Sequence, residues 1–149
     1  MKLAPVRRSS RERGQAVIEF GLSLVVFFLI TFGIVEYSRV QFINTFCAYG
    51  AQEGARYASL RGGDYTTACA TYTASNCNAT AANVTSYVTS LAVGMDTSKM
   101  TVSTVWPSGA NSSTNNVKVT VSYTYNPLLV AVLPSQLTLT STSTMPILW

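Results

Sequence analysis

The sequence predicts an α+β protein in which a long N-terminal helix precedes a small head made of one helix and a three-stranded antiparallel sheet. Two observations predict this class. An apolar stretch of twenty residues near the N-terminus continues, without an intervening proline, into a segment with helical spacing of small and apolar residues. After residue 64 the chain carries few charges and is rich in threonine, serine and valine, which favours strands over disorder.

The apolar stretch comprises residues 16–35 and contains a single charged side chain, Glu19. Twenty helical residues, at about 1.5 Å each, cover the ~30 Å hydrocarbon core of a bilayer. A removable secretory signal would have a shorter apolar core, followed by small residues at a cleavage site. The sequence VEYSRVQF that follows here offers no such site. We therefore predict a transmembrane helix at residues 15–36, embedded in the lipid bilayer.

The net charge of +4 belongs to the first segment of the chain. Residues 1–14 hold five basic side chains and one acidic side chain, whereas from Gln15 onward five basic and five acidic residues cancel. The positive-inside rule then places residues 1–14 in the cytoplasm and the chain beyond Tyr37 outside. The neutral remainder has no basic surface for nucleic acid, so a nucleic-acid partner is excluded.

The helical pattern extends past the membrane segment. Small or apolar residues recur every three or four positions from Val40 to Ala58, and the paired glycines Gly62 and Gly63 end the helix. One helix is therefore expected over residues 15–60. Its extracytoplasmic continuation is assigned to residues 37–61 and the α+β head to residues 62–149. We expect the outer part of the helix to pack against this head.

Four elements are expected in the head. The apolar spacing of residues 80–93 predicts an amphipathic helix that Gly94 stops. Strict alternation over residues 117–125 is the strongest strand pattern in the chain. Two further strands are predicted at residues 101–106 and 137–144. The apolar segments LLVAVL and MPILW are too short to cross a membrane and are expected in the core or at a subunit contact.

Three cysteines and the absence of histidine limit the chemistry of the chain. Histidine is the commonest general base and metal ligand, and no Cys-x-x-Cys pair is present, so neither a metal nor another cofactor is expected. Cys69 and Cys77 close a short loop, where a disulfide outside the cytosol would stabilise the head by roughly 2–3 kcal/mol. Two unpaired, buried thiols are the alternative.

The sequence does not carry the usual patterns of an enzyme. The head has no acidic pair at helical spacing and no Gly-x-Ser-x-Gly elbow. Three Asn-x-Ser/Thr sites, at Asn78, Asn83 and Asn111, are expected by chance in a chain so rich in these residues. We therefore expect a structural protein, with a signal-anchored periplasmic enzyme as the weaker alternative.

The stretch RGQAVIEF places a glycine where the basic segment meets the apolar run, with a glutamate five residues later and an aromatic residue next. This resembles the cleavage site of type IV prepilins, which a membrane-bound prepilin peptidase cuts after the glycine. The resemblance implies that residues 1–14 are a prepilin-type leader ending at Gly14. Gln15 then becomes the mature N-terminus, Glu19 its fifth residue, and Phe20 occupies the position where many pilins have an aromatic.

The wider pattern resembles the TadE-like family, the pseudopilins (minor pilins) of the tight-adherence, or Flp-type, pilus systems of bacteria. The residues that carry it are GQAVIEFGLSLVVFFLITFGIVEYSR, AYGAQEGARYAS, VSYTYNPLL and STSTMP. The resemblance covers nearly the entire chain, and its N-terminal half is the most specific part. It implies a type IV pilin-like fold and a role in pilus assembly and cell adhesion. The similar TadG-like proteins, which are membrane anchored, are the alternative within this class.

The resemblance also implies partners and a location. The partners are prepilin peptidase, other pilins and pseudopilins of the Tad/Flp system, and the pilus platform of the inner membrane. The expected location is the bacterial inner membrane, in a single pass with the head in the periplasm or outside the cell, or incorporation in a pilus.

Cleavage after Gly14 would leave an α-amine at Gln15, and at neutral pH its charge is opposite to that of Glu19. In an apolar bundle each charge alone is costly, and a pair offsets much of that cost. Glu19 pairing with the Gln15 amine of a neighbouring subunit would set the axial register of packed helices. The alternative is that Glu19 lies in the headgroup zone and folds back on its own N-terminus.

Overall fold

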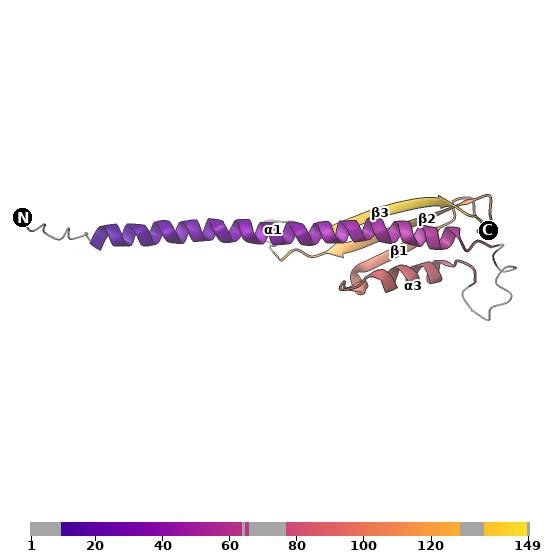
Figure 1. The fold of residues 1–149 in the computed structure, drawn as a ribbon, viewed down its shortest axis with the longest axis horizontal. Helices are drawn as coiled ribbons and strands as arrows, with labels where there is room; N and C mark the ends of the chain where they lie inside the picture. The colour runs from indigo at the N-terminus through magenta and orange to yellow at the C-terminus, as the bar shows by residue number, and fades with distance from the viewer. Residues whose placement is uncertain (1–9, 64, 66–76, 129–135, 149) are drawn as a thin grey trace, which may run out of the picture. The chain divides into compact units, whose positions relative to one another are not determined.

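The computed structural model describes residues 10–63, 65, 77–128 and 136–148 (Figure 1). Two compact units divide the chain, residues 1–38 and residues 39–149, so the long helix contributes to both. The fold is the predicted α+β, pilin-like class. Its elements are α1 (Ser10–Ser59), α3 (Ala81–Leu91), the short 3-10 helix η1 (Thr97–Lys99), β1 (Met100–Val105), β2 (Asn116–Tyr125) and β3 (Leu137–Pro146).

Helix α1 begins at Ser10, five residues before the predicted start at Gln15. Residues 10–14 include no proline, and Arg and Glu are good helix formers, so the backbone continues the helix in the N-terminal direction. Within the apolar stretch the hydroxyl of Thr31 donates to the carbonyl of Phe27 at 2.9 Å. This local bond satisfies the hydroxyl without any tertiary partner.

In the second unit, α1 packs on the sheet through one stripe of small side chains, which confirms the predicted packing of its outer part. The spacing of three and four residues places these side chains on a single helix face. Alanine at several positions lets the helix backbone come close to the strands. The buried members of the stripe are Ile43, Cys47, Ala51, Ala55 and Ala58.

Helix α3 confirms the helix predicted at residues 80–93. Thr80 is its N-cap and accepts a hydrogen bond from the backbone N–H of Asn83 at 3.2 Å. The helix ends at Leu91, and Gly94 follows with φ of +76°, a conformation that glycine adopts without strain. Val84 and Val88 form the buried face of α3.

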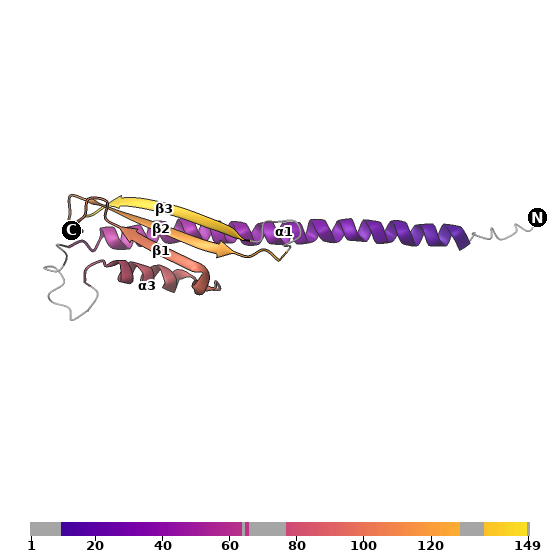
Figure 2. The same ribbon diagram turned by 180° about the vertical axis from the view of Figure 1, so that it is seen from behind.

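The sheet has three strands and is antiparallel throughout, as predicted. Its strand order is β1-β2-β3. Both views of the ribbon show β3, β2 and β1 in that order, with α3 beyond β1 (Figures 1 and 2). The alternation of β2 confirms the strongest strand prediction, because its odd-numbered side chains from Val117 to Tyr125 are buried. The even-numbered side chains of β2 and β3 form the opposite face of the sheet, which is rich in hydroxyl groups.

The C-terminal tail closes the core beside the end of α1. The backbone N–H of Leu148 donates to the carbonyl of Ser59 at 3.0 Å, and the Ser59 hydroxyl donates to the carbonyl of Pro146. Ile147 is 2% exposed, so part of the tail MPILW belongs to the core, as expected. Most of the other apolar segment, LLVAVL, lies outside the described residues.

Candidate processing and assembly site

The four residues predicted for processing and assembly lie in the first turns of α1 and are all exposed. Gly14 and Gln15 are helical, and nothing lies within 4 Å of the position that a Cβ on Gly14 would occupy. Gln15 and Glu19 are four residues apart, which places them on the same face of the helix, one turn apart. Phe20 is 68% exposed. The carboxylate of Glu19 is therefore accessible to a partner beside the helix.

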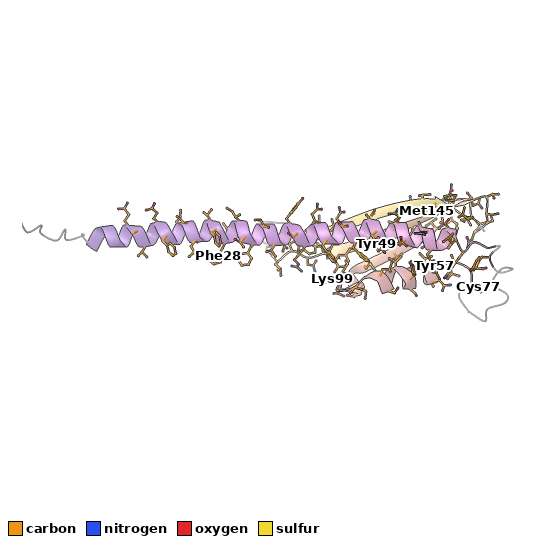
Figure 3. All side chains as sticks on the ribbon, viewed as in Figure 1. Phe28, Tyr49, Tyr57, Cys77, Lys99 and Met145 are labelled. Atoms are coloured by element: carbon orange, nitrogen blue, oxygen red, sulfur yellow. The ribbon has the colours of Figure 1, made fainter. Side chains whose placement is uncertain are left out.

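From Val17 to Val35 the apolar side chains of α1 point outward on every side. Figure 3 shows them projecting from the helix, with Phe28 labelled. From Val17 to Val35 the large apolar residues are 36–73% exposed, and none of the most apolar window of α1 is buried. A continuous apolar surface of this kind requires lipid or other helices around it. In the part of the chain that the structure describes, α1 is the one helix long and apolar enough to cross a membrane.

Residues 14–56 match the sequence model of the TadE-like protein family. The match begins at Gly14 and ends at Arg56 within α1, which confirms the resemblance predicted from the N-terminal motifs. Neither a curated protein nor a solved structure matches the chain. Together with the apolar helix, the TadE-like match indicates a membrane-anchored component associated with the Tad pilus.

The head holds a free thiol and a disulfide-bonded cysteine. Cys47 is unpaired and fully buried under the sheet, with its Sγ 3.8 Å from the carbonyl oxygen of Leu139. Burial raises the pKa of the Cys47 thiol, which keeps it protonated and unreactive at neutral pH. Cys77 is disulfide-bonded, and its expected partner, Cys69, lies outside the described residues. The pairing of Cys69 with Cys77 therefore stays a prediction.

We expect non-reducing peptide mapping of the protein isolated from membranes to recover Cys69 linked to Cys77. Cys47 should be alkylated only after denaturation, because its sulfur is buried in the folded head. The measurement is mass spectrometry of peptides alkylated before and after reduction. Alkylation of both Cys69 and Cys77 without a reductant would contradict the pairing.

Polar side chains of the head have local structural roles. Asp96 caps η1 by accepting hydrogen bonds from the Ser98 hydroxyl at 2.6 Å and its backbone N–H at 3.1 Å. These bonds hold the pKa of the exposed Asp96 carboxyl below its usual value. In the described ranges no three His, Cys, Asp or Glu side chains are grouped as a metal site would require.

The Asn-x-Ser/Thr sites are also part of the internal hydrogen bonding. The side-chain nitrogen of Asn83 donates to the carbonyl of Asn78 at 3.1 Å, and that of Asn111 donates to the carbonyl of Ala79 at 3.1 Å. The side-chain oxygen of Asn78 is itself buried. The first bond is local to the start of α3, and the second holds that start to the loop between β1 and β2. These internal roles support reading the Asn-x-Ser/Thr pattern as coincidental.

Sequence inspection missed one pair of structurally important residues, Gly50 and Gly54. Their absent side chains leave room for α3: a Cβ on Gly54 would lie 2.9 Å from a methyl of Val88 and 3.1 Å from one of Val119. A Cβ on Gly50 would lie 3.3 Å from the other methyl of Val88. The spacing Gly-x-x-x-Gly on a helix, a pattern known for close helix approach, was the available signal.

Proposed function

We propose that this chain is a TadE-like minor pilin (pseudopilin) that takes part in assembling a tight-adherence, Flp-type pilus. We further propose that prepilin peptidase cuts it after Gly14. The observation that carries the proposal is the start of the family match at Gly14, where the basic segment meets the exposed apolar surface of α1. Every residue of the expected cleavage junction that the structure describes is exposed, and Gly14 presents no side chain to a peptidase.

Cleavage changes the chemistry at the N-terminus of the helix. The new α-amine at Gln15 and the carboxylate of Glu19 bear opposite charges at neutral pH. Within one chain the two residues are one helical turn apart, and the carboxylate also faces outward, where a neighbour's amine can meet it. Because Coulomb attraction strengthens as water is excluded, a pair between subunits favours one axial register of packed helices.

The domain boundaries and orientation follow from the same proposal. Residues 1–14 are the leader, residues 15–36 span the inner membrane, and residues 37–61 continue the helix toward the head at residues 62–149. The five basic side chains of the leader keep the N-terminus in the cytoplasm. The direct partners are prepilin peptidase, other pilins and pseudopilins of the Tad/Flp system, the inner-membrane platform and the lipid bilayer.

The test of this function is the N-terminal residue of the protein isolated from membranes of cells with an active prepilin peptidase. Mass spectrometry should find a chain that begins at Gln15, and Gly14→Val should accumulate as the longer precursor because valine puts a branched side chain at the cut. Wild-type protein that retains residues 1–14 would contradict processing. It would favour the second candidate, an unprocessed TadE- or TadG-like anchor of the pilus machinery.

A further inference from the structure

The end of the head at which α1 enters it is held close to the membrane by the covalent chain. The apolar stretch ends at Val35, and α1 continues without a break through Arg39, the first residue of the second unit. Four helical residues advance by about 6 Å. The headgroup layer on one side of a bilayer has a similar thickness, since it accounts for the difference between the ~30 Å hydrocarbon core and the ~40–45 Å total. Arg39 is therefore expected at the depth of the lipid headgroups.

Two loops of the second unit project from the same end as Arg39. The Cζ of Arg39 lies 5.4 Å from the centre of the Tyr125 ring, which is at the end of β2. Tyr125 is paired with Leu137, the first residue of β3, and Tyr123 is paired with Met100, the first residue of β1. The loop that follows β2 and the connection from α3 to β1 therefore lie at this end of the sheet (Figures 1 and 2). This end, which carries Arg39 and Tyr125, is the proximal end of the head.

The proximal end carries the two most exposed large apolar side chains of the described residues 39–148. Leu128, three residues after β2, is 73% exposed, and Val93, between α3 and β1, is 83% exposed. The described residues of the loop after β2, 126–128, carry no charge. Apolar side chains that project in this way beside a membrane are typical of segments that enter the boundary between headgroups and acyl chains.

We propose that the proximal end docks on the bilayer that anchors α1, with the side chain of Leu128 inserted among the lipid headgroups. The partner is the lipid surface itself: the upper acyl chains receive the leucine side chain, and the lipid phosphates lie at the depth of Arg39. Arg39 is exposed, and guanidinium groups bind phosphate well. The proposal goes beyond the role in pilus assembly. It requires only that α1 is anchored in a membrane, so it applies equally to a processed pilin and to an unprocessed anchor.

A single leucine binds a membrane weakly from solution, but α1 already holds the head at the surface. This tether makes the second contact intramolecular and raises its effective concentration, so a small gain from insertion is enough. Two contacts with one bilayer, through α1 and through the proximal end, would limit the tilt of the head. The contact must therefore be measured on the full chain in a bilayer.

The first test measures lipid contact with a fluorescent dye at Asn126, which is exposed and two residues from Leu128. Full-length Asn126→Cys is labelled without a reductant and reconstituted in vesicles of phosphatidylethanolamine and phosphatidylglycerol. Some of the lipids carry a nitroxide quencher just below the headgroup. The buried Cys47 is not labelled in the folded head, and wild-type protein carried through the same labelling gives the background. The dye should be strongly quenched by these lipids and protected from dissolved iodide.

The decisive comparison changes the side chain at position 128 while the dye stays at position 126. Leu128→Glu should reduce quenching by the lipids several-fold, because a carboxylate disfavours insertion, and Leu128→Phe should retain it. Thermal unfolding of each variant checks that the head remains folded. Equal quenching with Leu128→Glu would show that the tether alone brings the dye near lipid, and would overturn the proposal.

The matched control is Leu148→Glu, which changes an exposed leucine at the other end of the head. The N–H of Leu148 donates to the carbonyl of Ser59 at 3.0 Å, and Ser59 lies about 30 Å beyond Arg39 along α1. Leu148→Glu should therefore leave the quenching of the dye at position 126 unchanged. A loss equal to that of Leu128→Glu would show a general effect of charge on the head and would contradict docking through Leu128.

The second test separates lipid from a protein partner, because another subunit could also cover Leu128. The lipid-to-protein ratio of the vesicles is raised in steps, and the access of iodide to the dye is measured at each step. Protection by lipid should not change, because each chain docks on the bilayer around it. Loss of protection on dilution would assign Leu128 to a contact between subunits and would overturn the proposal.

Discussion

Replacing Glu19 by glutamine should leave cleavage after Gly14 intact and strongly reduce incorporation into the pilus machinery. Glutamine keeps the size and polarity of the side chain and removes its charge, so the new amine at Gln15 loses its opposite charge. Breaking a desolvated pair in this way costs roughly 3–5 kcal/mol, and much less where the amine reaches the headgroups. Recognition by the peptidase depends on the junction at Gly14 and should be unaffected.

Two measurements on one strain decide this prediction. A gel gives the ratio of precursor to mature protein, and co-purification with the other pilins, or counting of surface pili, gives assembly. Glu53→Gln is the matched control, because it removes a carboxylate from the same helix outside the apolar stretch. Glu19→Asp, which keeps the charge, should retain more assembly than Glu19→Gln. Normal assembly of Glu19→Gln would show that Glu19 acts in the headgroup zone only.

Gly54→Val should unfold or severely weaken the head, lowering its free energy of unfolding by about 3 kcal/mol. Even a Cβ at this position comes within 2.9 Å of Val88 and 3.1 Å of Val119, and the γ-methyls of valine need more room still. Val88 and Val119 are 0% exposed, so they have no solvent-filled space into which to move. The loss is a large part of the 5–15 kcal/mol that stabilises a typical domain.

Thermal unfolding of the full chain in detergent, followed by circular dichroism and limited proteolysis, measures this effect. Gln52→Val is the control, because Gln52 is exposed on the same helix. Valine at this position lowers helix propensity slightly, whereas replacing a glycine by valine does not, so a larger loss in Gly54→Val must come from packing. Shortening the opposing side chain should relieve the clash. The double variant Gly54→Ala with Val88→Ala should therefore lose less free energy of unfolding than the sum of the losses in the two single variants. A Gly54→Val head as stable as that of Gln52→Val would contradict the close approach of α1 and α3.

Local patterns were enough to predict the elements of this protein. The long helix could be predicted because no proline interrupts the spacing from the apolar stretch to Ala58, and hydrogen bonding in a helix depends only on neighbours along the chain. The alternation from Val117 to Tyr125 predicted β2 and its buried face for the same reason. The motif at Gly14 and Glu19 could also be recognised from the sequence alone, since its residues lie close together along the chain.

The tertiary structure alone decided how these elements meet. Alternation in β2 does not say that this strand is central, and the TSTST run of β3 does not say that its outer edge remains unpaired within the described chain. The Gly-x-x-x-Gly spacing of Gly50 and Gly54 also does not say which side chains come close to them, and here they are valines of α3 and β2. Each of these features depends on contacts between residues far apart in sequence, whose partners are chosen by packing of the whole head. Periodicity determines which face of an element is buried, whereas the shape of the assembled core determines what covers it.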